Sequence, residues 1–111
     1  MIANSCSEFK LIYVVVEAGH GSFIMNSARE AGAEGGTTYF ARGTSIHEHG
    51  KFLGVPIEPE KEVVMIIIKD SMADQVFDYV VKKGELDTPG KGVAFILDLS
   101  RVAGICHLLD E

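Results

Sequence analysis

Residues 60–84, EKEVVMIIIKDSMADQVFDYVVKKG, join an unbroken apolar run to a stretch with helical periodicity. Val63–Ile68 is apolar at every position, which predicts a strand covered on both faces. In the residues that follow, apolar side chains recur every three to four positions, which predicts a helix with one broad apolar face. We expect Ser71 to cap the start of this helix and Gly84 to be the left-handed residue just beyond its end.

Three more strands and one more helix are predicted around this unit. Phe9–Val16, Thr37–Arg42 and Val93–Leu99 are rich in β-branched and aromatic residues, which favours strands. Ser22–Ala33 carries alanine and isoleucine on one helical stripe and predicts a helix. Residues 101–109 show no clear period, and we expect them to form a short edge strand or a tail.

The segment Thr44–Pro59 interrupts this regular pattern. It contains two of the three prolines of the chain and the polar sequence His47-Glu48-His49. Such a long connection in a small domain is typically functional or disordered. The two histidines supply at most two metal ligands, and His20 and His107 are the available additions, whereas a metal site needs three or four convergent ligands. A solvated polar loop without a metal is therefore the favoured interpretation.

The order of the predicted elements, βαββαβ, indicates an α+β fold of the ferredoxin-like type, a two-layer sandwich. We expect a tail at residues 1–8 and a single domain at residues 9–111. Two helices can cover only one face of the sheet, yet the strands are apolar on both faces and 47% of the 111 residues are apolar. The sequence therefore predicts an obligate homo-oligomer that covers the second face with copies of itself.

Charge and hydropathy exclude several classes of protein. Sixteen acidic and ten basic residues give a net charge of −6, the wrong sign for a nucleic-acid binding surface. The longest apolar runs are far shorter than the roughly 20 residues of a membrane-spanning helix, and the N-terminus lacks the pattern of a signal peptide. We therefore expect a cytoplasmic protein. Cys6 and Cys106 lack metal or redox spacing and fit reduced thiols better, with a disulfide between the chain ends as the alternative.

The segment Leu86–Gly92 is the sharpest local motif. Its glycines flank Lys91, so the backbone can turn tightly and offer amides and one positive charge to an anion. The segment lacks the spacing of a Walker A loop, and by itself a simple turn before a strand is the favoured interpretation. Because no nucleophile has an evident base beside it, nothing in the sequence favours an enzyme.

Four segments taken together resemble the nitrogen regulatory P-II signalling family, and most strongly its P-II-like branch. They are AGAEGGTT at residues 31–38, ARGT at 41–44, PEKEVV at 59–64 and GELDTPGKG at 84–92. The resemblance extends over about residues 9–105 and includes the order of the elements.

This resemblance implies a homotrimer that binds an adenine nucleotide (ATP, ADP or AMP), with Mg²⁺ as an accompanying ion, in the clefts between subunits. It implies a regulatory protein without enzymatic activity, acting on a protein partner such as a membrane transporter through a T-loop at residues 44–59. The nucleotide-binding residues that it implies are Gly35, Gly36, Thr37, Gly43, Thr44, Ser45, Thr88, Gly90, Lys91, Gly92 and Arg101. Arg42 and Lys61 would flank the T-loop or meet an effector.

The sequence also departs from the family pattern. Residues 44–59 form a shorter T-loop without tyrosine, and no glutamine lies near residues 45–47 to bind magnesium and 2-oxoglutarate. Arg101 is the one candidate for the pair of arginines that normally holds the phosphates. We therefore expect altered nucleotide selectivity and a ligand and partner unlike those of nitrogen-sensing members. A metal-responsive trimer resembling the divalent-cation tolerance proteins, which share the fold, is the alternative.

Overall fold

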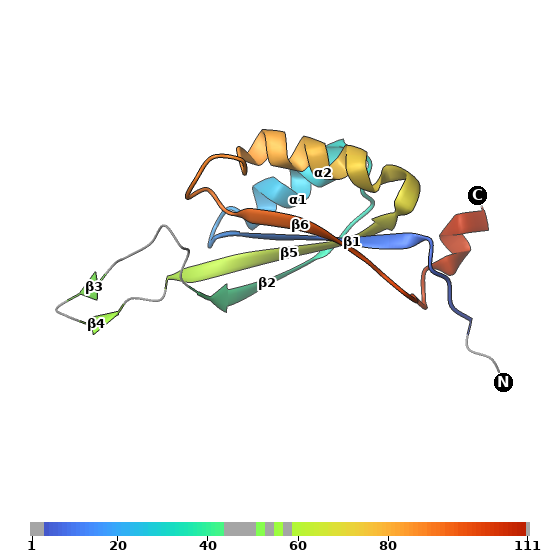
Figure 1. The fold of residues 1–111 in the computed structure, drawn as a ribbon, viewed down its shortest axis with the longest axis horizontal. Helices are drawn as coiled ribbons and strands as arrows, with labels where there is room; N and C mark the ends of the chain where they lie inside the picture. Colours follow the sequence, from blue (N-terminus) through green and yellow to red (C-terminus); the bar gives the residue numbers. More distant parts are fainter. Residues whose placement is uncertain (1–3, 44–50, 53–54, 57–58, 111) are drawn as a thin grey trace.

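The computed structural model describes residues 4–43, 51–52, 55–56 and 59–110. Four strands form one antiparallel sheet in the order β2-β5-β1-β6, and both helices lie on one of its faces (Figure 1). The main elements are β1 (Phe9–Glu17), α1 (Gly21–Glu30), β2 (Thr37–Arg42), β5 (Glu60–Lys69), α2 (Asp70–Gly84) and β6 (Val93–Asp98). This arrangement confirms the predicted ferredoxin-like α+β fold.

The hydrophobic core lies between the helices and the inner face of the sheet. Alternate residues of β1 and β5, among them Val14 and Val64, point into it because side chains of a strand alternate between its two faces. Val76 and Val80 of α2 are fully buried against them. The apolar face that the sequence periodicity predicts for α2 is therefore the face that the helix buries against the sheet.

The outer face of the sheet is apolar and uncovered in the single chain. Tyr39, Ile67, Val93, Phe95 and Leu97 are 39–52% exposed, and the strand register places them all on the side opposite the core. The Phe95 ring stacks on Tyr13 with centroids 5.0 Å apart. The hydrogen bond between the hydroxyls of Tyr13 and Tyr39 raises the pKa of Tyr39. The prediction of an uncovered apolar face is confirmed.

Inside the segment predicted as an irregular loop, the structure adds a small hairpin. β3 (Lys51–Phe52) and β4 (Val55–Pro56) pair antiparallel and extend beyond one end of the main sheet (Figure 1). The expectation of a connection without strands is therefore wrong for these four residues. Thr44, Ser45, His47 and His49 lie outside the described residues.

Both predicted ends of α2 are also wrong. Lys69 rather than Ser71 is the N-cap, and no side chain caps the helix; instead the amide of Asp70 donates to the Glu8 carbonyl at 3.0 Å. Gly84 is the last helical residue, and Glu85 takes the left-handed conformation with φ of 52°. Gly84 is needed for packing, because a Cβ there would lie 3.0 Å from the Ile24 side chain.

The two ends of the described chain are joined, at the end of the sheet away from β3 and β4 (Figure 1). Cys6 and Cys106 form a disulfide with Cα atoms 5.9 Å apart, so the expectation of reduced thiols is wrong for this structure. Cys6 also forms an antiparallel bridge with Val102, and a short 3-10 helix, η1 (Cys106–Asp110), follows. Spacing along the sequence could not predict this pair, because pairing of the terminal segments brings the sulfurs together.

Over the described part of the chain, the structure has no helix long and apolar enough to cross a membrane.

Candidate functional site

One wall of the candidate site is the loop between α2 and β6. Two successive turns shape this loop, with the amide of Thr88 donating to Glu85 and that of Lys91 donating to Thr88. Gly90 has φ of 88° and Gly92 φ of 146°, which other residues rarely adopt. A Cβ at Gly92 would lie 2.6 Å from the Val15 carbonyl oxygen. The glycines therefore let the loop fold tightly against the end of β1.

The other wall is the turn that leads from β1 into α1. Antiparallel pairing of β1 with β6 brings the end of β1 beside the start of β6. The amide of His20 donates to the Glu17 carbonyl at 3.1 Å. On either side of His20, the amides of Gly19 and Gly21 donate to Oε1 of Glu62 at 2.9 and 3.0 Å. Glu62 is only 8% exposed, so a buried carboxylate of β5 holds this turn in place.

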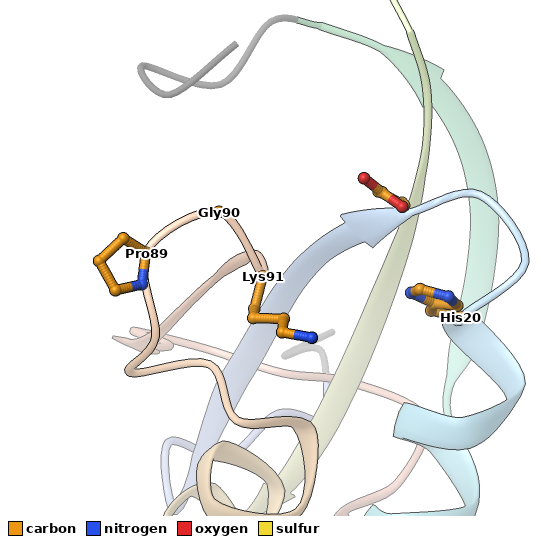
Figure 2. Close-up of a pocket in the computed structure, with 5 residues that line it drawn as sticks. His20, Pro89, Gly90 and Lys91 are labelled. Atoms are coloured by element: carbon orange, nitrogen blue, oxygen red, sulfur yellow. The ribbon is translucent and has the colours of Figure 1, made fainter.

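A pocket of about 220 Å³ lies between the two walls and is lined by Glu17, His20, Pro89, Gly90 and Lys91. Lys91 extends from its loop toward the side on which His20 lies (Figure 2). An ammonium group, an imidazole and a carboxylate thus face one small space. Lys91 and the loop amides can hold an anion, whereas the Glu17 carboxylate can accept from a hydroxyl group or bind a cation.

Three lining residues were not among the predicted site residues: Glu17, His20 and Pro89. In the sequence, His20 is a candidate only as an additional metal ligand. The predicted topology could have pointed to Glu17 and His20. In a βαββαβ fold the first strand ends beside the start of the last strand, so residues after the first strand lie near the loop before the last. Glu62 gave no sequence signal, since its role depends on a contact between residues 41 positions apart.

The base of the segment 44–59 lies at the same end of the sheet as the pocket. Arg42 pairs with Glu60 across β2 and β5, and Lys61 pairs with Glu17 across β5 and β1. The amide of Gly43 donates to the Pro59 carbonyl at 3.4 Å and closes the base. Lys61 is buried at 9% exposure. The structure therefore groups Gly43, Arg42 and Lys61 at the sheet end that carries the pocket.

Four other predicted residues lie away from the pocket. Thr37 begins the edge strand β2 and pairs with Met65, midway along β5. Gly36 precedes it and packs against the Met65 carbonyl oxygen, from which a Cβ at position 36 would lie 2.6 Å away. Arg101 donates to Oγ of Ser5 at 3.3 Å. None of Gly35, Gly36, Thr37 and Arg101 lines the pocket of the same chain.

Metal-ligating side chains do not gather in the described ranges: no group of three or more histidine, cysteine, aspartate or glutamate residues could hold an ion there. His47 and His49 lie outside those ranges.

The family model described as nitrogen regulatory protein P-II matches residues 9–107. The chain belongs to the P-II family. No curated protein sequence matches the chain. The family match confirms the resemblance inferred from the four sequence segments. The pocket lies at one of these segments, residues 84–92.

Solved structures of P-II proteins share the fold of this P-II chain. The crystal structure of Arabidopsis thaliana PII bound to citrate superposes with a TM-score of 0.68 at 19% identity, covering 89% of this chain and 84% of that chain. CPII, a PII-like protein from Thiomonas intermedia bound to ADP, AMP and bicarbonate, gives a TM-score of 0.68 at 15% identity. It covers 91% of this chain and 98% of that chain. At these identities the likeness concerns the fold.

Proposed function

We propose that this P-II chain is a non-enzymatic regulatory protein that binds an adenine nucleotide in clefts between the subunits of a homotrimer. The observation that carries the proposal is the pocket between Lys91 and the turn at His20, which lies at the same end of the sheet as the base of the segment 44–59. Glu17, which lines the pocket, pairs with Lys61 of β5, one of the two strands from which that segment departs. Binding can therefore be coupled to the conformation of the T-loop.

The trimer is supported by the exposed apolar face of the sheet. Five large apolar side chains are 39–52% exposed on this face, and exposed apolar patches mark interaction surfaces: Tyr39, Ile67, Val93, Phe95 and Leu97. Burying them against two further copies gives a closed assembly, as is usual for homo-oligomers. Gly35, Gly36, Thr37 and Arg101 then reach the ligand from a neighbouring subunit, which accounts for their distance from the pocket of their own chain.

Within the cleft, Lys91 pairs with the phosphates, and the positive φ angles of Gly90 and Gly92 allow the backbone to approach them closely. Thr88 contacts the nucleotide from the same loop. Gly43, Thr44 and Ser45 contact the nucleotide from the T-loop base, while Arg42 and Lys61 flank it. CPII, which shares the fold, is bound to ADP, AMP and bicarbonate. This likeness supports an adenine nucleotide as the ligand and is compatible with a second small anion.

Mg²⁺ fits the donor set of the pocket. Glu17 supplies a carboxylate among the lining residues, and Mg²⁺ prefers oxygen ligands from carboxylates and phosphates. Without a cation, this carboxylate would repel a nucleotide phosphate. Mg²⁺ at this position neutralises part of that repulsion.

The output of the protein is a contact with a protein partner in the cytoplasm, with membrane transporters as one class. The T-loop carries no tyrosine, so regulation is by ligand rather than by modification of such a residue. Native mass spectrometry of the purified protein tests the proposal. A trimer carrying bound adenine nucleotide supports it, and a monomer that carries none after incubation with ATP, ADP and AMP contradicts it.

A further inference from the structure

The two cysteines of the chain lie 100 residues apart in sequence and are bonded to one another. We propose that Cys6 and Cys106 form a reversible thiol–disulfide site that clasps the N-terminal segment to the C-terminal segment. The clasp comprises the disulfide, the backbone bridge between Cys6 and Val102, and the contact between Ser5 and Arg101.

The backbone bridge aligns the two sulfurs. The amide of Cys6 donates to the Val102 carbonyl at 2.9 Å, and the amide of Val102 donates to the Cys6 carbonyl at 2.7 Å. The two sulfurs lie 3.8 and 3.3 Å from that same Val102 carbonyl oxygen. Two thiols at these positions would therefore have an acceptor within reach, so the reduced pair is not left without polar contacts.

The clasp lies outside the hydrophobic core. Both cysteines are half-buried, and neither belongs to the cluster formed by the helices and the inner face of the sheet. The four-stranded sheet and both helices are complete without residues 4–7 and 101–110. Opening the disulfide should therefore release the two segments locally while the domain stays folded.

The reaction is thiol–disulfide exchange with a low-molecular-weight thiol such as glutathione. An external thiolate attacks one sulfur of the pair, forms a mixed disulfide and expels the other cysteine as a thiolate, which takes up a proton. A second external thiol then releases the first cysteine as a thiol and leaves as the oxidised small-molecule disulfide. Two electrons pass to the protein, and the reverse sequence closes the clasp.

A half-buried disulfide is accessible to such a thiol, unlike one enclosed in a core. In the cytoplasmic location proposed above, disulfides are usually transient rather than permanent structural bonds. Accessibility and location therefore both favour a switch that follows the thiol–disulfide balance of its surroundings.

The clasp also fixes Arg101, which lies next to Val102 and donates to Ser5. This part of the inference depends on the proposed function, in which Arg101 contacts a nucleotide held by a neighbouring subunit. A closed clasp restrains Arg101, so that less conformational entropy is lost on binding, and nucleotide should bind more tightly to the oxidised protein.

Poised mixtures of reduced and oxidised glutathione test the clasp on the whole protein. Free thiols are counted by alkylation and mass spectrometry, and amide hydrogen exchange is followed in the same samples. We expect the disulfide fraction to follow the glutathione ratio in both directions. In the reduced samples the amides of Cys6 and Val102 should exchange about tenfold faster or more, while those of Val14 and Val64 in the core stay protected.

Two variants serve as controls. Cys6→Ser/Cys106→Ser should behave like the reduced protein at every ratio. Ser22→Ala, an exposed substitution on α1 outside the clasp, should retain the response to glutathione. A disulfide that glutathione leaves intact, thiols that remain unpaired in oxidised glutathione, or reduction that unfolds the core would each overturn the clasp.

Nucleotide titrations separate the clasp from the proposed function. We expect the dissociation constant to rise about threefold or more on reduction, and equal affinity in both states would overturn the link to Arg101. If neither form binds nucleotide, the proposed function fails and the link fails with it, whereas the clasp itself is decided by thiol counting.

Discussion

The carboxylate of Glu62 accepts a hydrogen bond from the amide of Gly21 at 3.0 Å, and a Cβ at Gly21 would lie 2.1 Å from the second carboxylate oxygen. The side chain thus occupies the space that any larger residue at position 21 would need. Because the same oxygen also binds the amide of Gly19, the backbone on both sides of His20 is fixed by one residue of β5. The geometry of the pocket therefore depends on a buried side chain that does not line it.

Replacing Glu62 with alanine should destabilise the fold. The amides of Gly19 and Gly21 lose their acceptor in a mostly buried position, which costs about 2 kcal/mol of unfolding free energy. Glu62→Gln keeps an oxygen acceptor and should lose clearly less. Chemical denaturation of the three proteins measures the difference. Equal stability of wild type and Glu62→Ala would contradict this role of the carboxylate.

Gly21→Ala should also be destabilising, by about 1–3 kcal/mol, because the new methyl group collides with the Glu62 side chain. In the double variant Gly21→Ala/Glu62→Ala the collision is absent. We therefore expect the double variant to be less destabilised than the sum of the two single variants. Strict additivity in denaturation experiments would show that the two residues do not interact.

Phe95→Asp should disrupt the assembly. Phe95 is 39% exposed in the single chain and stacks from the edge strand β6 on Tyr13 of the neighbouring strand β1. An interface on this outer face would bury an unpaired charge at position 95. Phe23→Asp is the matched control, because Phe23 is 53% exposed but lies on α1, on the other side of the sheet. Light scattering should give a trimer for wild type and Phe23→Asp, and smaller species for Phe95→Asp. A monomeric wild type would refute the trimer.

Glu17→Gln should reduce the effect of magnesium on nucleotide binding. For the wild-type protein we expect ATP to bind more tightly in Mg²⁺ than in a chelator, because the cation bridges the Glu17 side chain and the phosphates. The neutral glutamine removes the repulsion between residue 17 and the phosphates, and it also weakens the binding of the cation. Titrations with and without Mg²⁺ measure both effects. An unchanged dependence on Mg²⁺ in Glu17→Gln would place the ion elsewhere.

The sequence predicts the sheet and the helices because their periodicity is local information. Val63–Ile68 and the apolar stripe of the second helix each identify their element without reference to the rest of the chain. The uncovered sheet face follows as well, since it requires only the number of helices. The ends of α2 do not follow, because the backbone of Glu8 and the packing of Gly84 on Ile24 decide them.

The candidate site was predictable only in part. The glycines around Lys91 mark the loop in the sequence, and the structure places Gly90 and Lys91 in the pocket. His20 meets this loop, and Glu62 holds the turn that carries His20, only through the tertiary fold. The disulfide needs the pairing of Cys6 with Val102. These contacts join residues far apart in the chain, for which a single sequence carries no periodic or spacing signal.

Isothermal titration of the wild-type protein with ATP, ADP and AMP, repeated on Lys91→Ala, tests the proposed nucleotide site most directly. Lys10→Ala removes the same charge at the opposite end of the sheet, where Lys10 lies 3.4 Å from Asp98, and is the matched control. We predict that at least one nucleotide binds to wild type and Lys10→Ala with similar affinity. Lys91→Ala should bind about tenfold more weakly or worse, because a charge-assisted contact to phosphate is lost. Absence of binding to the wild-type protein, or equal affinity in Lys91→Ala, would contradict the account.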